Sequence, residues 1–204
     1  MAPGVDSKAK SEPDRSAKPL WIRMLYLGDS LTNGARDPYA LSWPYYMAQS
    51  ALDDDVVILP YVESKNGRRS SELVRVSLPA IEKSGAKEAF ILIGTNDAKD
   101  ENVLPVDQYI ANVLLIQNWC RVLGIREYIM TIPLPAGFGS PGYTLPVVDR
   151  IKEYNVALRG LNLPRLIECE DIRETVDGVH FSADAAKETA RRAWEAVKSE
   201  RTLV

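Results

Sequence analysis

The chain has little of several residue types that mark particular functional classes. Among its 204 residues are two cysteines and a single histidine, and the formal net charge is only −3. Cys120 and Cys169 are too far apart to form a paired metal or redox motif, so we interpret them as small buried residues and leave their pairing open. A metal centre with several histidine ligands is excluded, because His180 is the only histidine.

Blocks of like charge and long hydrophobic runs are also missing. A nucleic-acid surface would be basic and clustered, and a membrane-surface helix would show similar clustering, so we expect neither partner. No apolar run is long enough to span a bilayer. Residues 1–19 are polar and contain no apolar signal region, and we interpret them as a disordered tail. The chain as given is therefore expected in the cytoplasm, with secretion from a longer precursor left open, and its oligomeric state is not predicted.

From residue 20 to 204 we expect one domain in which short apolar runs alternate with amphipathic stretches. Strands are predicted at 21–27, 56–62, 89–93, 127–132 and 165–169. Helices are predicted at 39–52, 70–83, 106–123 (the longest), 145–161 and from Ser182 to about 199. This alternation is typical of an α/β protein, with a three-layer α/β/α, flavodoxin-like five-stranded parallel sheet in the order 2-1-3-4-5. Pro60 places the second strand at an edge of the sheet.

The polar residues that stand out come directly after the predicted strands. They form four short segments: Gly28-Asp29-Ser30-Leu31-Thr32, Asn66-Gly67, Gly94-Thr95-Asn96-Asp97 and Asp177-Gly178-Val179-His180. Because the carboxyl ends of parallel strands share one edge of the sheet, segments far apart in the sequence are expected to converge there, where open α/β folds bind ligands.

These groups match the requirements of acyl transfer, which needs a nucleophile, a base, an orienting group and donors for the oxyanion. Ser30 is the candidate nucleophile, and His180 the base that takes its proton. Asp177 lies three residues before His180, so one turn would bring its carboxylate to the ring and fix the tautomer. The backbone amides of Ser30 and Gly67 and the side-chain amide of Asn96 are the candidate oxyanion donors.

With these four segments the sequence resembles the SGNH (GDSL-type) hydrolases. The GDSL block matches residues 28–31, the GxND block residues 94–97 and the DxxH block residues 177–180, in the family's order, while the second block matches at the glycine Gly67. The resemblance implies a five-stranded parallel sheet, esterase-like activity without a cofactor, and Ser30, Gly67, Asn96 and His180 as site residues, with Asp177 completing a triad.

The substrate class expected from the sequence is a carboxylic ester with a short acyl group, including acetylated carbohydrates, cleaved through an acyl-enzyme. The loops after the strands are short and polar, and the one long loop, 133–144, offers only Leu134, Phe138 and Tyr143 as apolar surface. Acyl transfer to another acceptor, thioester hydrolysis and lysophospholipid hydrolysis on the same site remain alternatives, as does a non-catalytic binding module.

Plainer explanations of the same residues also remain. GDSL fits a helix-capping turn, Asn96 and Asp97 a turn, and Gly67 a turn that needs glycine. A further alternative is a metal-dependent phosphoesterase, in which Asp29, Asp97, Asp177 and His180 would surround a cation.

Overall fold

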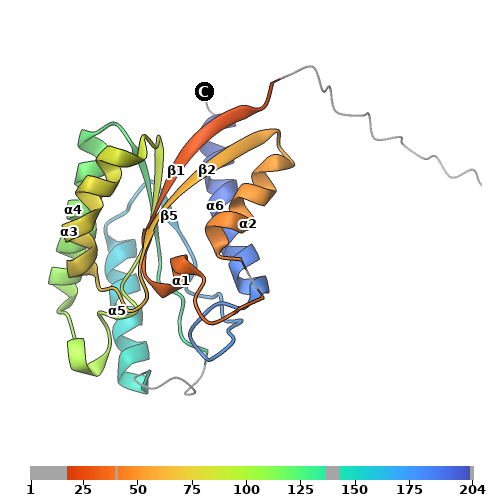
Figure 1. The fold of residues 1–204 in the computed structure, drawn as a ribbon. Coiled ribbons are helices and arrows are strands. Elements are labelled where there is room, and N and C mark those ends of the chain that lie inside the picture. Colours follow the sequence, from red (N-terminus) through yellow and green to blue (C-terminus); the bar gives the residue numbers. More distant parts are fainter. Residues whose placement is uncertain (1–17, 40, 137–142, 203–204) are drawn as a thin grey trace, which may run out of the picture.

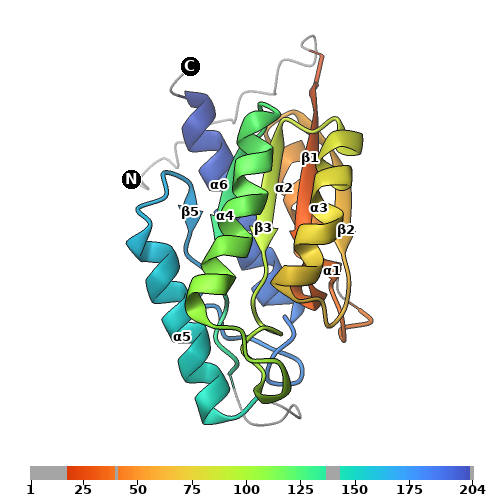
Figure 2. The ribbon, with the colours of Figure 1, turned by 90° about the vertical axis from the view of Figure 1, so that its left-hand side faces the viewer.

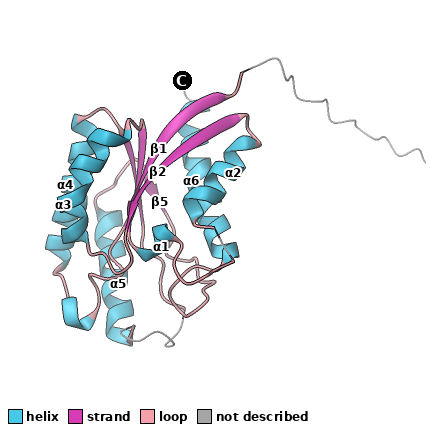
Figure 3. Cartoon of the chain, viewed as in Figure 1, coloured by secondary structure: helices cyan, strands magenta, loops and turns pink. Residues whose placement is uncertain are grey.

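The computed structural model describes residues 18–39, 41–136 and 143–202. Strands and helices alternate along the chain (Figures 1 and 3). The strands are β1 (Leu20–Gly28), β2 (Val56–Ser64), β3 (Glu88–Leu92), β4 (Arg126–Met130) and β5 (Leu166–Ile167). The helices are α1 (Ser30–Asn33), α2 (Trp43–Leu52), α3 (Ser70–Ser84), α4 (Val106–Val122), α5 (Leu145–Gly160) and α6 (Ala183–Thr202), with a 3-10 helix η1 (Asp100–Asn102).

The five strands are all parallel and lie in the order β2-β1-β3-β4-β5, which confirms the predicted topology. β2, which contains Pro60, is an edge strand as expected. β3 lies in the centre, and all five of its residues are buried. Such a strand has neighbours on both sides and helices over both faces, so after Glu88 its sequence is continuously apolar instead of alternating.

Helices cover both faces of the sheet and make the predicted three layers. In β1, Leu25 and Leu27 face the core shared with α3, α4 and α5, whereas Met24 and Tyr26 face the core shared with α2 and α6. Alternate side chains of a strand point to opposite faces, which gives the two cores. Figure 1 shows the sheet between the two groups of helices, and Figure 2 shows α3 and α4 in front of it.

Several predicted boundaries were wrong. The helix predicted from residue 39 begins at Trp43, because Ser42 is still extended and Pro44 occupies the first turn, where its missing N–H leaves no bond unmade. The predicted strand 165–169 has only two paired residues. The longest described helix is α6, with 20 residues against 17 in α4. Ser182 does cap α6, since its Oγ accepts a hydrogen bond from Ala185 N.

Three other expectations concern the cysteines, membrane spans and the chain ends. Cys120 and Cys169 are buried and free. Within the described ranges, no helix is long and apolar enough to cross a membrane. Residues 1–17 of the predicted tail and residues 137–142 of the predicted loop, Phe138 among them, lie outside the described residues.

Gly28, the last residue of β1, supplies a stability prediction. A Cβ there would lie 2.2 Å from Thr32 Oγ1 and 2.7 Å from Leu92 O, and the latter atom is backbone and cannot move aside. We expect Gly28→Ala to destabilise the protein by about 1–3 kcal/mol, as overpacked substitutions do. Gly160→Ala is the control, because nothing lies within 4 Å of its Cβ position and alanine favours a helix. Urea denaturation of both variants measures the difference, and equal stabilities would contradict the prediction.

Candidate active site

Ser30 is placed by the sharp connection between β1 and α1. Asp29 is the N-cap of α1, and its Oδ1 accepts a hydrogen bond from Leu31 N at 2.9 Å. Gly28 allows the chain to turn close to Thr32 and Leu92, because a Cβ at this position would clash with both residues. Ser30 is therefore the first residue of α1, at the carboxyl end of β1, and is 6% exposed. The capping turn suggested as the plainer explanation is present, and it is the turn that positions the serine.

His180 and Asp177 are held together by a tight turn after β5. Asp177 Oδ1 accepts hydrogen bonds from His180 N at 2.9 Å and Val179 N at 3.1 Å. Gly178 has a φ of 88° and donates its N–H to Thr175 Oγ1 at 3.0 Å. A glycine adopts this left-handed conformation without the strain that a Cβ would bring. The three-residue spacing thus brings carboxylate and imidazole side by side, as predicted.

Three side chains form one hydrogen-bonded chain. His180 Nδ1 lies 2.8 Å from Asp177 Oδ2, and His180 Nε2 lies 3.1 Å from Ser30 Oγ. An ionised carboxylate only accepts, so we assign the ring proton to Nδ1 and leave Nε2 to accept from the serine hydroxyl. Burial acts to raise the pKa of Asp177, but hydrogen bonds from the backbone and ring of His180 outweigh it and lower that pKa. The carboxylate is therefore ionised at neutral pH.

The predicted oxyanion donors lie around the same opening. Ser30, Gly67, Asn96 and His180 line one cleft of about 310 Å³. Gly67 has a φ of 76°, and nothing in the protein lies within 4 Å of its Cβ position. Glycine is favoured at this turn by its positive φ, which agrees with the alternative that Gly67 is a turn glycine. Close packing within the protein does not require it.

Asn96 is 4% exposed and its side-chain amide is held in place from one side. Asn96 Nδ2 donates to Arg68 O at 3.1 Å and lies 3.5 Å from Asp29 Oδ2. The first contact is a good hydrogen bond, whereas the second is at the limit of one. One N–H thus anchors the amide to the turn that carries Gly67, and the other has only the weak contact to Asp29.

Asp97 does not line the cleft and has a structural role. It is fully buried, and it accepts hydrogen bonds from Ser70 N at 3.0 Å and Ser70 Oγ at 2.6 Å. Ser70 is the first residue of α3, so Asp97 ties the segment after β3 to the start of that helix. No motif or spacing in the sequence marks Ser70, which lies 27 positions away from its partner.

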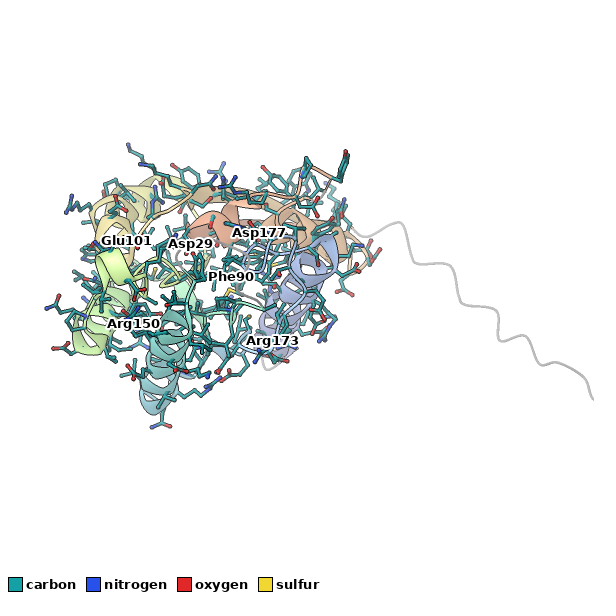
Figure 4. All side chains as sticks on the ribbon, turned by 90° about the horizontal axis from the view of Figure 1, so that it is seen from below. Asp29, Phe90, Glu101, Arg150, Arg173 and Asp177 are labelled. Atoms are coloured by element: carbon teal, nitrogen blue, oxygen red, sulfur yellow. The ribbon has the colours of Figure 1, made fainter. Side chains whose placement is uncertain are left out.

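The carboxylates proposed for a cation site are engaged separately. Asp97 binds Ser70, Asp177 binds His180, and Asp29 caps α1. Within the described ranges, no group of three or more His, Cys, Asp or Glu side chains is placed to hold a metal ion. The side chains suggested for a phosphoesterase centre are therefore not gathered into one. Figure 4 views this side of the molecule and labels Asp29 and Asp177.

Four further residues that lie outside the predicted segments also line the cleft: Ala35, Arg36, Lys99 and Tyr143. Tyr143 was noted only as apolar surface of the long loop. Lys99 lies three residues after Asn96, and Arg36 comes after α1, but neither belongs to a motif or a periodic pattern. Tyr39, Tyr45 and Tyr46 do not line this cleft, and Trp43 is buried in the core beside it.

No family model and no curated protein sequence matches the chain. Solved structures match it over most of its length. An aryl esterase from M. smegmatis has a TM-score of 0.74 at 17% identity, covering 87% of this chain and 99% of its own. A carbohydrate acetylesterase from Sinorhizobium meliloti has a TM-score of 0.72 at 20% identity, with 87% and 99% covered. A lipase/acylhydrolase from Enterococcus faecalis has a TM-score of 0.70 at 16% identity, with 88% and 96% covered.

The chain has the fold of these hydrolases. The structural similarity establishes the fold. At sequence identities this low it does not establish the catalytic roles of the residues, which depend on the geometry of the site itself.

Asp29 supplies a prediction of pH-dependent stability. Burial raises the pKa of Asp29 to about 7; the hydrogen bond from Leu31 N opposes this rise, and the nearby charge of Asp97 adds to it. A raised pKa in the folded state means that stability is greatest below the unfolded value of about 4 and is lost as the pH rises to about 7. We expect Asp29→Asn to gain stability relative to wild type between pH 4 and 8, by at most roughly 4 kcal/mol.

The measurement is urea denaturation of both proteins at pH 5 and pH 8. Asp53→Asn is the matched control, because it removes an exposed carboxyl from the end of α2. A stability difference between wild type and Asp29→Asn that does not change with pH would contradict the prediction.

Proposed function

We propose that the protein is an SGNH-type esterase that hydrolyses carboxylic esters with short acyl groups through an acyl-enzyme on Ser30. The observation that carries this proposal is the hydrogen-bonded chain from Ser30 Oγ through His180 to Asp177, with separations of 3.1 and 2.8 Å. The order of the four sequence segments supports it, and so does the likeness to an aryl esterase and a carbohydrate acetylesterase. Acetylated carbohydrates are accordingly one candidate class of substrate.

Acylation begins at the serine hydroxyl. Ser30 Oγ attacks the ester carbonyl carbon while its proton passes to His180 Nε2, which is already within hydrogen-bond distance. The imidazolium that forms is stabilised by the ionised Asp177. His180 then gives its proton to the leaving alcohol as the bond between acyl carbon and alcohol oxygen breaks. The acyl group remains on Ser30, and the alcohol leaves neutral.

Deacylation repeats these steps with water. His180 takes a proton from water as the water oxygen attacks the acyl carbon, and the proton returns to Ser30 Oγ when the acid leaves. In both halves the carbonyl oxygen becomes an anion. The backbone amides of Ser30 and Gly67 and the Asn96 N–H that has only the weak contact to Asp29 are the donors for that charge. Asn96 suits this role because its hydrogen bond to Arg68 O fixes the amide before substrate arrives.

The limit on acyl size comes from a second hollow beside Ser30. This pocket has a volume of only about 10 Å³. Its apolar lining includes Leu31, Leu41, Trp43 and Phe181, and its polar lining residues are Ser30, Asp37 and Ser42. Trp43 is fully buried and packs edge-on against Tyr26, with 5.1 Å between the ring centroids. Its side chain therefore forms a fixed wall of the pocket. A space of this size accepts a methyl group but no extended chain. We therefore assign the acyl group to this pocket.

The first test of the proposed function is Ser30→Ala. We expect hydrolysis of 4-nitrophenyl acetate to fall by at least about a thousandfold, because the nucleophile is lost, while oxyanion donors and binding give only residual rate. A fluorophosphonate probe is expected to label wild type at Ser30, identified by mass spectrometry of the labelled peptide. Ser50→Ala, a half-buried serine in α2, is the control and should label normally. Labelling of Ser30→Ala at another serine would contradict the assignment.

The second test concerns acyl length. We expect kcat/KM to be highest for acetyl esters and to fall steeply from acetyl through butyryl to octanoyl esters of one alcohol, because the pocket beside Ser30 has no room for further methylenes. A true acyl groove would instead favour each added methylene by about 0.8 kcal/mol. A maximum at octanoyl or palmitoyl would show that the acyl chain binds elsewhere.

A further inference from the structure

Two hollows of different character meet at Ser30. The small one is lined mainly by apolar side chains, whereas the cleft of about 310 Å³ is lined largely by polar and charged residues. His180 lines only the larger cleft. The group that protonates the leaving alcohol must lie within reach of the alcohol oxygen, so the alcohol portion of the ester belongs in the cleft with His180.

The cleft contains more positive than negative charge. Its charged lining residues are Arg36, Lys99 and Asp177, and its other titratable lining residues are His180 and Tyr143. The carboxylate of Asp177 is already hydrogen bonded to His180. Among the described residues, no carboxylate lies within ion-pair distance of Arg36 or Lys99, whereas other arginines, such as Arg68, Arg150 and Arg159, do form such pairs. Two cations therefore face the space assigned to the alcohol.

The chain segments that carry both cations are connected to other residues of the site. Ala35 N donates to Ser30 O at 3.1 Å, which ties the residue before Arg36 to the nucleophile's own backbone. Arg36 has a φ of 79°, a conformation that non-glycine residues adopt rarely and that clusters at functional sites. Lys99 Nζ lies 4.8 Å from the centre of the Tyr143 ring, another wall of the cleft.

Arg68, which lies next to the cleft residue Gly67, has a structural role and differs in this from Arg36 and Lys99. It comes directly after Gly67, is buried, and bonds to Glu63 through Oε1 at 2.8 Å and through the backbone O at 3.0 Å. Its charge is paired within the protein. Arg36, in contrast, is exposed and Lys99 is half-buried, and both line the open cleft.

We infer that the preferred substrate is a short-acyl ester whose alcohol portion carries a negatively charged group, bound by Arg36 and Lys99. This inference rests on the proposed function. Charges of this kind at the rim of a site act mainly by selecting and steering a ligand of opposite sign. The acyl pocket then sets the size of the group transferred, and the two cations select the alcohol.

The test compares two acetate esters of the same size, 4-acetoxybenzoate and its neutral counterpart 4-acetoxybenzamide. Their kcat/KM ratio is measured at low ionic strength and divided by the ratio of their hydroxide-catalysed rates, which removes the difference in intrinsic reactivity. We expect this corrected ratio to be about ten or more in wild type. It should fall several-fold in Lys99→Gln and in Arg36→Gln, approach one in the double variant, and decline as salt is added.

Lys83→Gln is the matched control, because it removes one exposed positive charge from the last turn of α3, at the end of that helix remote from Ser70. Its corrected ratio should equal that of wild type. A corrected ratio near one in wild type, or one unchanged in the double variant, would overturn the inference while leaving the proposed function standing. Failure to hydrolyse either ester, with no fluorophosphonate labelling of Ser30, would overturn both.

Discussion

The geometry of the site depends on one buried carboxylate, that of Asp97. It accepts the backbone N–H and the hydroxyl of Ser70 and so fixes the start of α3 against the segment after β3. Asn112 Nδ2 donates to the same Ser70 hydroxyl at 2.9 Å and completes the link to α4. Asn96, the neighbour of Asp97, bonds the carbonyl of Arg68. The turn of Gly67 and the amide of Asn96 are thus held in register by contacts that no substrate touches.

This arrangement places two acidic groups close together in the interior. Burial raises the pKa of Asp97, although the hydrogen bonds from Ser70 oppose the rise, and the charge of Asp97 in turn adds to the raised pKa of Asp29. Buried carboxyls lower stability unless hydrogen bonds compensate for lost hydration. Asp29 has such a bond from Leu31 N, and it lies at the end of β1, where the serine must be presented. That bond offsets the burial only in part, since the pKa of Asp29 is still raised to about 7, so the ionised carboxylate lowers stability next to the nucleophile.

Topology and short spacing made most of the site predictable from the sequence. Polar segments after parallel strands must meet at one edge, and Asp177 and His180 are close enough in sequence to pair through a single turn. Helix α1 was not predicted, since four residues are too few to show a helical period. The hydrogen bond between Asp97 and Ser70 links the segment after β3 to the start of α3, and Arg36 and Lys99 line one cleft from different loops. Only the packed loops determine such contacts, because neither pair has a spacing or composition that marks it.

The two hollows at Ser30 differ because a different layer lies beneath each. Trp43 of α2 and Phe181, just before α6, close one side with rigid aromatic surface that belongs to the core. The other side is built from loops that leave the sheet, so it is open and polar. Lys99 lines that side, and its charge slightly opposes the rise in the pKa of Asp29 that burial causes.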